Sequence, residues 1–234
     1  MSTFKLLELD NCPIYHQLQI EEALLRTDEN NWCILNHGSP VSIVLGISGK
    51  PELLINPQTI SHQKIPLIRR YSGGGTVIVD HNTCFVTWIC NADTITVKTF
   101  PQPVAQWTEA FYKPLFNGID FKLIENDYVI GNRKCGGNAQ YFAKNRWVHH
   151  TTFLWDFDEE NMNHLLVPAK VPGYRHSRSH SDFLCTLKDH FPEQKAFLEL
   201  IKDQLSSIFE IKKVSENSVK EFLLKPHRKT TQIL

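Results

Sequence analysis

Apolar residues at helical spacing predict two long helices, one near each end of the chain. The first covers residues 11–26, where Asp10 or Asn11 can cap its start and Ile14, Leu18, Leu24 and Leu25 lie near one face. The second covers residues 192–209, and its apolar positions recur every three or four residues, at Phe197, Ile201, Leu205 and Ile208.

Short β-branched and aromatic runs predict strands in the middle of the chain. Residues 32–35 and 42–45 form two such runs on either side of a turn at Gly38-Ser-Pro40. Residues 76–79 and 84–89 form two more, and Asp80-His-Asn82 between them predicts a tight turn that joins adjacent strands.

The remaining segments complete an α+β pattern with one large, mostly antiparallel sheet. Further strands are expected at residues 121–124, 128–130 and 148–157, and a further helix at 103–117. Residues 50–64 are expected to be mostly loop with a helical turn. Residues 167–180 are expected to be an exposed loop, rich in basic and imidazole side chains. A short strand and a helix are expected before residue 225, and the polar tail from 225 to 234 is expected to be mobile.

Composition narrows the class of protein. Of the 234 residues, 25 are Lys or Arg and 25 are Asp or Glu, so the basic excess of a free nucleic-acid binder is missing. The N-terminal residues lack a signal-peptide pattern, and no apolar run is long enough to span a bilayer. The six cysteines form no CxxC pair, which disfavours a zinc site and suits reduced thiols in the cytoplasm.

A glycine-rich stretch, Arg69-Arg70-Tyr71-Ser72-Gly73-Gly74-Gly75-Thr76-Val77, is the most informative motif. Consecutive glycines leave backbone N–H groups accessible to an anion, and the preceding arginines can add positive charge. The motif is not a P-loop, because no Gly-Lys-Ser/Thr follows, and it is not a dinucleotide fingerprint, because a strand follows it. Taken alone, the motif is better explained as a glycine hinge before a strand, with the arginines on the surface.

A second stretch, Gly131-Asn132-Arg133-Lys134-Cys135-Gly136-Gly137-Asn138-Ala139-Gln140, places a lysine among small residues. Its compact ammonium suits a phosphate or a polarised carbonyl. A surface hairpin with a solvated lysine is the alternative for this stretch by itself.

The two stretches in this order, with Asn82-Thr-Cys-Phe85 between them and His149-His150 after them, resemble the lipoate–protein ligase A family of the biotin/lipoate ligase superfamily. The resemblance covers roughly residues 6–209, including Glu21-Glu22-Ala-Leu-Leu25 on the first predicted helix. It implies a single catalytic domain over residues 1–234, with a large, mainly antiparallel sheet, a smaller sheet and flanking helices. Residues 210–234 would be a short extension, and the accessory C-terminal domain of many members is expected to be absent.

The resemblance also implies roles for individual residues. Lys134 matches the essential lysine that contacts the acyl carbonyl and the α-phosphate. Asp127 is a candidate for holding Mg²⁺ or adenine, although a loop-capping aspartate fits as well. Of the two histidines, we expect His150 to face the pocket, since neighbours on a strand point to opposite faces. The acyl-adenylate would be held by Arg70, Ser72, Gly73, Gly74, Gly75, Thr76, Val77, Ile78 and Asn82.

The implied activity is activation of lipoate or octanoate by ATP, with Mg²⁺, and transfer of the acyl group to a lysine of a lipoyl carrier domain. Expected carriers are the E2 subunits of 2-oxoacid dehydrogenases or the glycine-cleavage H protein, and a separate accessory protein is possible in this family. Neither a nucleic acid nor a membrane is expected as a partner.

Three alternatives stay open at this stage. The chain could transfer a ready-made adenylate, or it could be a non-catalytic acyl or nucleotide binder. A transferase that uses a cysteine thioester needs a nucleophile in residues 167–173, where no cysteine occurs. The family's His-His-Gly-Thr is also replaced by His149-His-Thr-Thr152, which adds bulk beside the histidines.

Overall fold

The central element is an eight-stranded mixed sheet in the order β11-β1-β2-β6-β10-β9-β8-β7. We describe a computed structural model, which covers residues 2–60, 65–169 and 171–234. The strands pair antiparallel except for β1, which is parallel to both β2 and β11. Their bounds are β1 Thr3–Asp10, β2 Asn31–His37, β6 Thr83–Asn91, β7 Phe121–Ile124, β8 Asp127–Ile130, β9 Arg133–Phe142, β10 Arg146–Leu154 and β11 Glu210–Val214.

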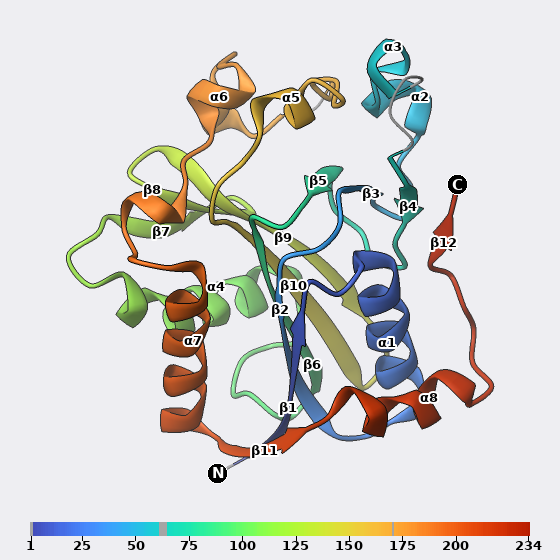
Figure 1. Cartoon of the computed structure of the whole chain (residues 1–234). Coiled ribbons are helices and arrows are strands. Elements are labelled where there is room, and N and C mark those ends of the chain that lie inside the picture. Colours follow the sequence, from blue (N-terminus) through green and yellow to red (C-terminus); the bar gives the residue numbers. More distant parts are fainter. Residues whose placement is uncertain (1, 61–64, 170) are drawn as a thin grey trace.

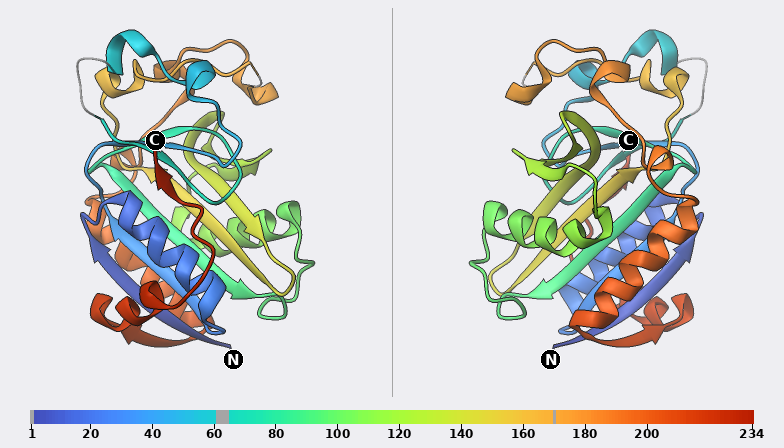
Figure 2. Two further views of the ribbon diagram at one scale, coloured as in Figure 1. Left: turned by 90° about the vertical axis from the view of Figure 1, so that its right-hand side faces the viewer. Right: turned by 90° about the vertical axis from the view of Figure 1, so that its left-hand side faces the viewer.

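Helices cover both faces of this sheet (Figure 1). α1 (Ile14–Thr27) and α8 (Lys220–Leu224) lie on one face, and α4 (Pro101–Tyr112) and α7 (Gln194–Ile208) lie on the other, as the two side views of Figure 2 show. Each face has its own apolar core: Leu18 and Leu24 pack on the α1 side, and Trp88 and Phe197 pack on the α4 and α7 side. Both long helices predicted from sequence are confirmed.

A smaller four-stranded sheet, in the order β12-β4-β3-β5, carries the glycine-rich stretch. Its strands are β3 (Ser42–Leu45), β4 (Leu67–Arg69), β5 (Val77–Val79) and β12 (Gln232–Ile233). The predicted strands 76–79 and 84–89 therefore exist, but the expectation that they pair with each other is wrong. At Asp80 the chain leaves the smaller sheet for the larger one, and a corner of hydrogen bonds from Gly38 and Ser39 to Thr83 and Asp80 holds the crossing.

The tail is the second correction. Instead of lying free, residues 232–233 pair antiparallel with β4, and the carboxylate of Glu22 on α1 accepts N–H bonds of 2.9–3.0 Å from Thr230 and Thr231. Because Glu22 is 2% exposed, this anchor is shielded from water. The tail thus fastens one edge of the smaller sheet to α1.

Other boundaries differ in smaller ways. Pro13 precedes α1 without a side-chain cap, and the Ser39 hydroxyl accepts the N–H of Ile14 at 3.0 Å, so neither Asp10 nor Asn11 caps the helix. Of the lysine stretch, Gly131 and Asn132 form the turn between β8 and β9, and residues 133–140 belong to the ten-residue strand β9. The 50–64 loop contains α2 (Pro51–Leu54) and α3 (Pro57–Ile60), while residues 61–64 lie outside the described residues. Short helices at Lys113–Phe116, Glu159–Met162 (α5), Gly173–Arg175, His180–Phe183 (α6), Leu187–Asp189 and Glu216–Val219 fill the connections.

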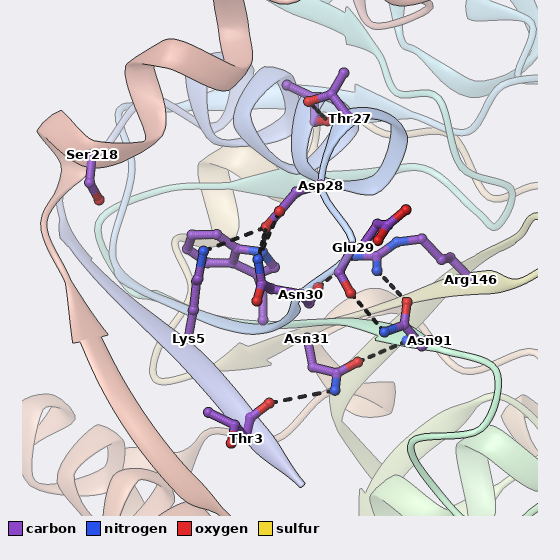
Figure 3. A network of polar contacts seen from close by, with 12 residues as sticks. Thr3, Lys5, Thr27, Asp28, Glu29, Asn30, Asn31, Asn91, Arg146 and Ser218 are labelled. Carbon is purple, nitrogen blue, oxygen red and sulfur yellow. Dashed lines mark hydrogen bonds and ion pairs between the residues drawn. The ribbon is translucent and has the colours of Figure 1, made fainter.

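A polar network fastens the end of the large sheet opposite the β5–β6 corner (Figure 3). Asn91, at the end of β6, donates its amide N–H to Asn31 Oδ1 at 2.9 Å and its side-chain N–H to the carbonyl of Glu29 at 2.7 Å. The guanidinium of Arg146 donates to Asn91 Oδ1 from β10. β2, β6 and β10 are therefore tied together at this end of the sheet. In the part of the chain that is described, no helix is both long and apolar enough to cross a membrane.

Candidate active site

A large cavity lies where the two sheets meet, on the α1 side of the large sheet. Its volume is about 1250 Å³, beyond the ~300–1,000 Å³ of typical small-ligand pockets, so it has room for a ligand with two parts. Its walls come from α1, the glycine-rich stretch, β6, β9 and β10, and segments between residues 162 and 184 close over it. The short helices α2, α5 and α6 gather on this side of the molecule, at the top of Figure 1.

Lys134 extends into this cavity from β9. A Cβ on Gly137 would lie 3.1 Å from the Lys134 ammonium, so the glycine leaves the room that the lysine occupies. The ammonium pairs with Asp127 Oδ1 at 2.8 Å, and the hydroxyl of Tyr174 donates to Asp127 Oδ2 at 2.9 Å. Asp127 thus holds the lysine in place and links it to the loop that carries Tyr174.

The glycine-rich stretch forms the opposite wall. Gly74 has φ +102°, and a Cβ there would lie 2.7 Å from Arg70 Nη2, so the local fold itself requires glycine. Gly75 differs: its φ is not positive, and a Cβ would meet nothing within 4 Å. Since nothing in the described structure requires glycine at position 75, its bare backbone suits the close approach of a ligand.

Arg70 lines the cavity, but the hydrogen bonds of its guanidinium go to backbone carbonyls of the protein. Its guanidinium donates to the carbonyls of Gly73 (2.9 and 3.2 Å), Gly75 (2.8 Å) and Val44 (3.4 Å). Burial lowers the pKa of this guanidinium to about 10, which leaves it a cation at neutral pH. Sequence reasoning gave Arg70 a direct ligand contact; in this structure, its contacts fold the glycine stretch.

The cavity continues as an apolar arm toward α1. This arm is the part of the cavity lined by Ile14, Leu18, Val77, Val79 and Phe85. Tyr71 and Trp32, two large aromatic side chains, are each 1% exposed in the core and lie outside the lining.

A buried polar cluster interrupts this apolar wall. His150 faces the cavity, and its Nδ1 lies 2.9 Å from an oxygen of Glu21, which is fully buried. Glu21 also accepts from Gln17 (2.8 Å) and Thr87 (2.7 Å). His150 Nε2 is buried and has no hydrogen-bond partner among the described residues, so it can accept or donate one bond to a ligand in the arm.

His149 points to the opposite face of the sheet. Its ring lies among Thr108, Asn138 and Gln140, outside the cavity lining. Burial, and secondarily the neighbouring His150, lower its pKa to about 3, so it is neutral in the folded protein. This placement follows from strand alternation and assigns His149 to the core.

Two predicted ligand contacts fall outside the lining. Ser72 is fully buried behind the glycine stretch, and its hydroxyl has no partner in the described ranges. Asn82 sits in the β5–β6 corner, where its N–H bonds Asp80 at 2.8 Å. Gly73, Gly74, Gly75, Thr76, Val77 and Ile78 all line the cavity.

The structure does not support Mg²⁺ at Asp127. Each of its carboxylate oxygens already has a partner, Lys134 or Tyr174. Residues 2–60, 65–169 and 171–234 contain no cluster of three His, Cys, Asp or Glu side chains that could hold a metal ion. We therefore derive no step through a metal.

Sequence reasoning missed three members of the site: Tyr174, Arg175 and the Glu21–His150 contact. Tyr174 and Arg175 belong to the segment predicted as an exposed loop, yet Arg175 is only 5% exposed and lines the cavity. The many basic and imidazole side chains in that segment could have indicated that it contributes to a binding site.

Comparisons with known proteins identify the family. The family described as "Lipoyl protein ligase A/B catalytic domain" matches residues 13–210. A Plasmodium falciparum protein named "Inactive lipoate–protein ligase 2" is 28% identical over 87% of this chain and 69% of its own length. Lipoate-protein ligase LplJ of Bacillus subtilis is 30% identical over 66% of this chain, but over only 45% of its own length. The chain thus spans less than half of that bacterial relative.

Solved structures show the same fold. The bi-partite lipoate protein ligase of Thermoplasma acidophilum, studied with its E2 lipoyl domain, superposes with a TM-score of 0.76 at 19% identity, covering 96% of this chain and 93% of that one. A lipoate-protein ligase A bound with ATP gives a TM-score of 0.72 at 18% identity, with 96% and 95% covered. From the family match over residues 13–210, this chain belongs to the lipoyl protein ligase A/B catalytic-domain family.

Proposed function

We propose that this chain is a lipoate–protein ligase, which converts lipoate or octanoate to its adenylate with ATP and transfers the acyl group to a lysine of a lipoyl carrier domain. One observation carries the proposal. A single cavity joins an apolar arm to a polar chamber in which the Lys134 ammonium and the bare backbone at Gly75 share one space. An acyl chain fits the arm, and a phosphate ester fits the chamber.

In the first step, a carboxylate oxygen of the fatty acid attacks the α-phosphorus of ATP and pyrophosphate leaves. Negative charge develops on phosphate oxygens, and Lys134 and the N–H groups of the glycine stretch stabilise it. In the second step, the carrier lysine attacks the acyl carbonyl, AMP leaves, and Lys134 stabilises the oxyanion. Asp127 keeps the ammonium oriented throughout, since it holds the lysine at 2.8 Å.

Relatives support the substrates of this proposal. One structural neighbour binds ATP, and another, from Plasmodium falciparum, was solved in complex with lipoate (TM-score 0.72, 19% identity, 94% of this chain and 70% of that one). The Thermoplasma neighbour was studied with an E2 lipoyl domain, which makes such a domain the acceptor to try first.

A second candidate is transfer of a ready-made acyl-adenylate without its synthesis. The observation that favours it is that the Plasmodium relative, which matches 87% of this chain, is named an inactive ligase. Both candidates use the same cavity and the same lysine, and they differ in whether ATP is a substrate.

A cysteine thioester route finds no support in the described residues. No cysteine lines the cavity, and all six are buried and free. Cys135, the neighbour of Lys134, faces the core with its Sγ 3.4 Å from the carbonyl of Tyr128, and burial raises the pKa of its thiol. Iodoacetamide should therefore leave activity intact.

The deciding experiment uses this chain alone with ATP, lipoate or octanoate, and an apo E2 lipoyl domain. The proposal expects a carrier mass increase by one acyl group, together with release of pyrophosphate. Transfer that occurs only when synthetic octanoyl-AMP is supplied would select the second candidate. Absence of transfer from either donor would refute both.

A further inference from the structure

The segment over the cavity holds a buried cation without a counter-charge. Arg175 is 5% exposed, and its Nη2 lies buried at the cavity wall without a hydrogen-bond partner in the described parts of the chain. Its Nε donates to the carbonyl of Arg178 at 3.1 Å, and its guanidinium carbon lies 5.0 Å from the ring centre of Phe183. These contacts fix the side chain, and neither of them is made to an acidic group.

A buried charge is costly unless an anion compensates it. Lys134 has Asp127 as its partner, and Arg70 is bonded to the carbonyls of its own loop. Among the described residues, Arg175 has no acidic partner and only one carbonyl bond, from its Nε to Arg178, which is itself a further cation. The cavity therefore contains positive charge beyond what the protein itself neutralises.

Arg175 and Lys134 act on the same part of the cavity. Tyr174, the residue before Arg175, donates its hydroxyl to Asp127, and Asp127 holds Lys134. His180, also in the lining, has a lowered pKa because of burial and then because of the positive charges of Arg175 and Lys134. Arg175 and Lys134 therefore both lower the pKa of the same imidazole, which places them on the same part of the cavity.

The charges of the reactants indicate which anion fits. An acyl-adenylate carries a single phosphate, for which Lys134 and the glycine stretch are available. ATP carries two further phosphates, and these hold most of its negative charge. A guanidinium binds two phosphate oxygens at once, which suits a pyrophosphoryl group better than a single shielded phosphate.

We propose that Arg175 forms a second anion subsite that binds the β- and γ-phosphates of a nucleoside triphosphate. The inference rests on the proposed function, because it assigns the leaving group of the adenylation step to this residue. When the carboxylate oxygen bonds to the α-phosphorus, the bond from that phosphorus to the α,β-bridging oxygen breaks. The bridging oxygen leaves with the electron pair on pyrophosphate, and Arg175 donates N–H bonds to its oxygens without losing a proton.

The test compares three variants of the full chain. Arg175→Met removes the charge, and Arg175→Lys retains it without the fork. Arg133→Met is the matched control, because Arg133 is an exposed arginine on β9 that donates to the carbonyl of Ser181 outside the cavity lining. Thermal unfolding first establishes that each variant folds.

Two half-reactions are then measured separately: octanoate-dependent exchange of pyrophosphate into ATP, and transfer from synthetic octanoyl-AMP to an apo lipoyl domain. For Arg175→Met we expect exchange to fall by about 100-fold or more, as for loss of one preorganised donor. Transfer should stay within threefold, Arg175→Lys should recover part of the exchange, and Arg133→Met should match the unmodified chain. Equal losses in both half-reactions, or a loss confined to transfer, would overturn the inference.

A binding experiment tests the anion subsite independently of the proposed function. Calorimetry with inorganic pyrophosphate alone needs no turnover. The unmodified chain should bind it, and Arg175→Met should bind it at least tenfold more weakly while Arg133→Met does not change. Equal affinities of the unmodified chain and Arg175→Met would reject the subsite, whatever the acyl-transfer assays give.

Discussion

The buried carboxylate of Glu21 makes the sharpest stability prediction. It is fully buried under the apolar arm, accepts bonds from Thr87 (2.7 Å) and Gln17 (2.8 Å), and has an oxygen 2.9 Å from His150 Nδ1. Glu21→Gln keeps the shape but removes the charge, and only one of the two oxygens that Gln17, Thr87 and His150 Nδ1 now share remains. Hydrogen bonds to charged groups contribute about 1.5–3 kcal/mol each, and a buried donor left unsatisfied costs about 1–3 kcal/mol.

We therefore expect the free energy of unfolding to fall by about 3 kcal/mol, and the melting temperature by roughly 6–12 °C at ~2–4 °C per kcal/mol for a chain of this size. Urea denaturation at neutral pH measures the change. Glu199→Gln is the control, since its side chain is 62% exposed in a surface ion pair with Lys202, and it should change stability by less than about 0.5 kcal/mol. A fall no larger for Glu21→Gln than for this control would refute the reasoning.

Three further predictions concern other parts of the chain. Gly137→Ala places a methyl group 3.1 Å from the Lys134 ammonium and should reduce acyl transfer about tenfold with little change in melting temperature; unchanged transfer would separate Gly137 from the lysine. Because the pKa of His149 is lowered to about 3, the unfolded state binds the extra proton between about pH 6.5 and pH 3, and stability falls with acid there. His149→Asn should remove up to about 1.4 kcal/mol per pH unit of that slope in denaturant titrations, and parallel curves would count against it. Glu22→Ala should release the tail, seen as faster hydrogen exchange at residues 230–233, and protection equal to the unmodified chain would contradict the anchor.

Acid should weaken the Glu22 anchor as well. Burial alone would raise the pKa of this carboxyl, but the N–H groups of Thr231 and Thr230 outweigh it and hold the pKa below its ordinary value. Since the folded pKa lies below the unfolded one, the anchor contributes its full stability above the unfolded pKa. That contribution is lost as pH falls through the folded value.

The parts of the fold that followed from sequence depend on local patterns. The apolar spacing at Phe197 and Leu205 belongs to one helix face, so periodicity alone located α7. By contrast, nothing near Asp80 tells whether the two flanking strands pair, because the partner of β5 is β3 and not β6. The docked tail depends on Glu22, about two hundred residues away, which a local reading of residues 225–234 cannot include.

The site residues also divide into those that local motifs identify and those that depend on the folded structure. The glycine stretch and Lys134 were identifiable because short motifs carry them, and the motifs' order along the chain suggested one shared site. Ser72 and Asn82 belong to the same motifs, yet their side chains lie outside the cavity lining. Arg175 depends on how the 167–180 segment folds over the cavity, which residue types alone do not specify.

Loss of the Lys134 ammonium tests the central claim most directly. Octanoate-dependent exchange of pyrophosphate into ATP is measured for Lys134→Ala and for Lys122→Ala, whose lysine is a surface residue paired with Asp120. The account predicts a drop of about 10²–10³-fold for Lys134→Ala and no more than a threefold change for Lys122→Ala. Exchange by folded Lys134→Ala within threefold of the unmodified chain would contradict the account.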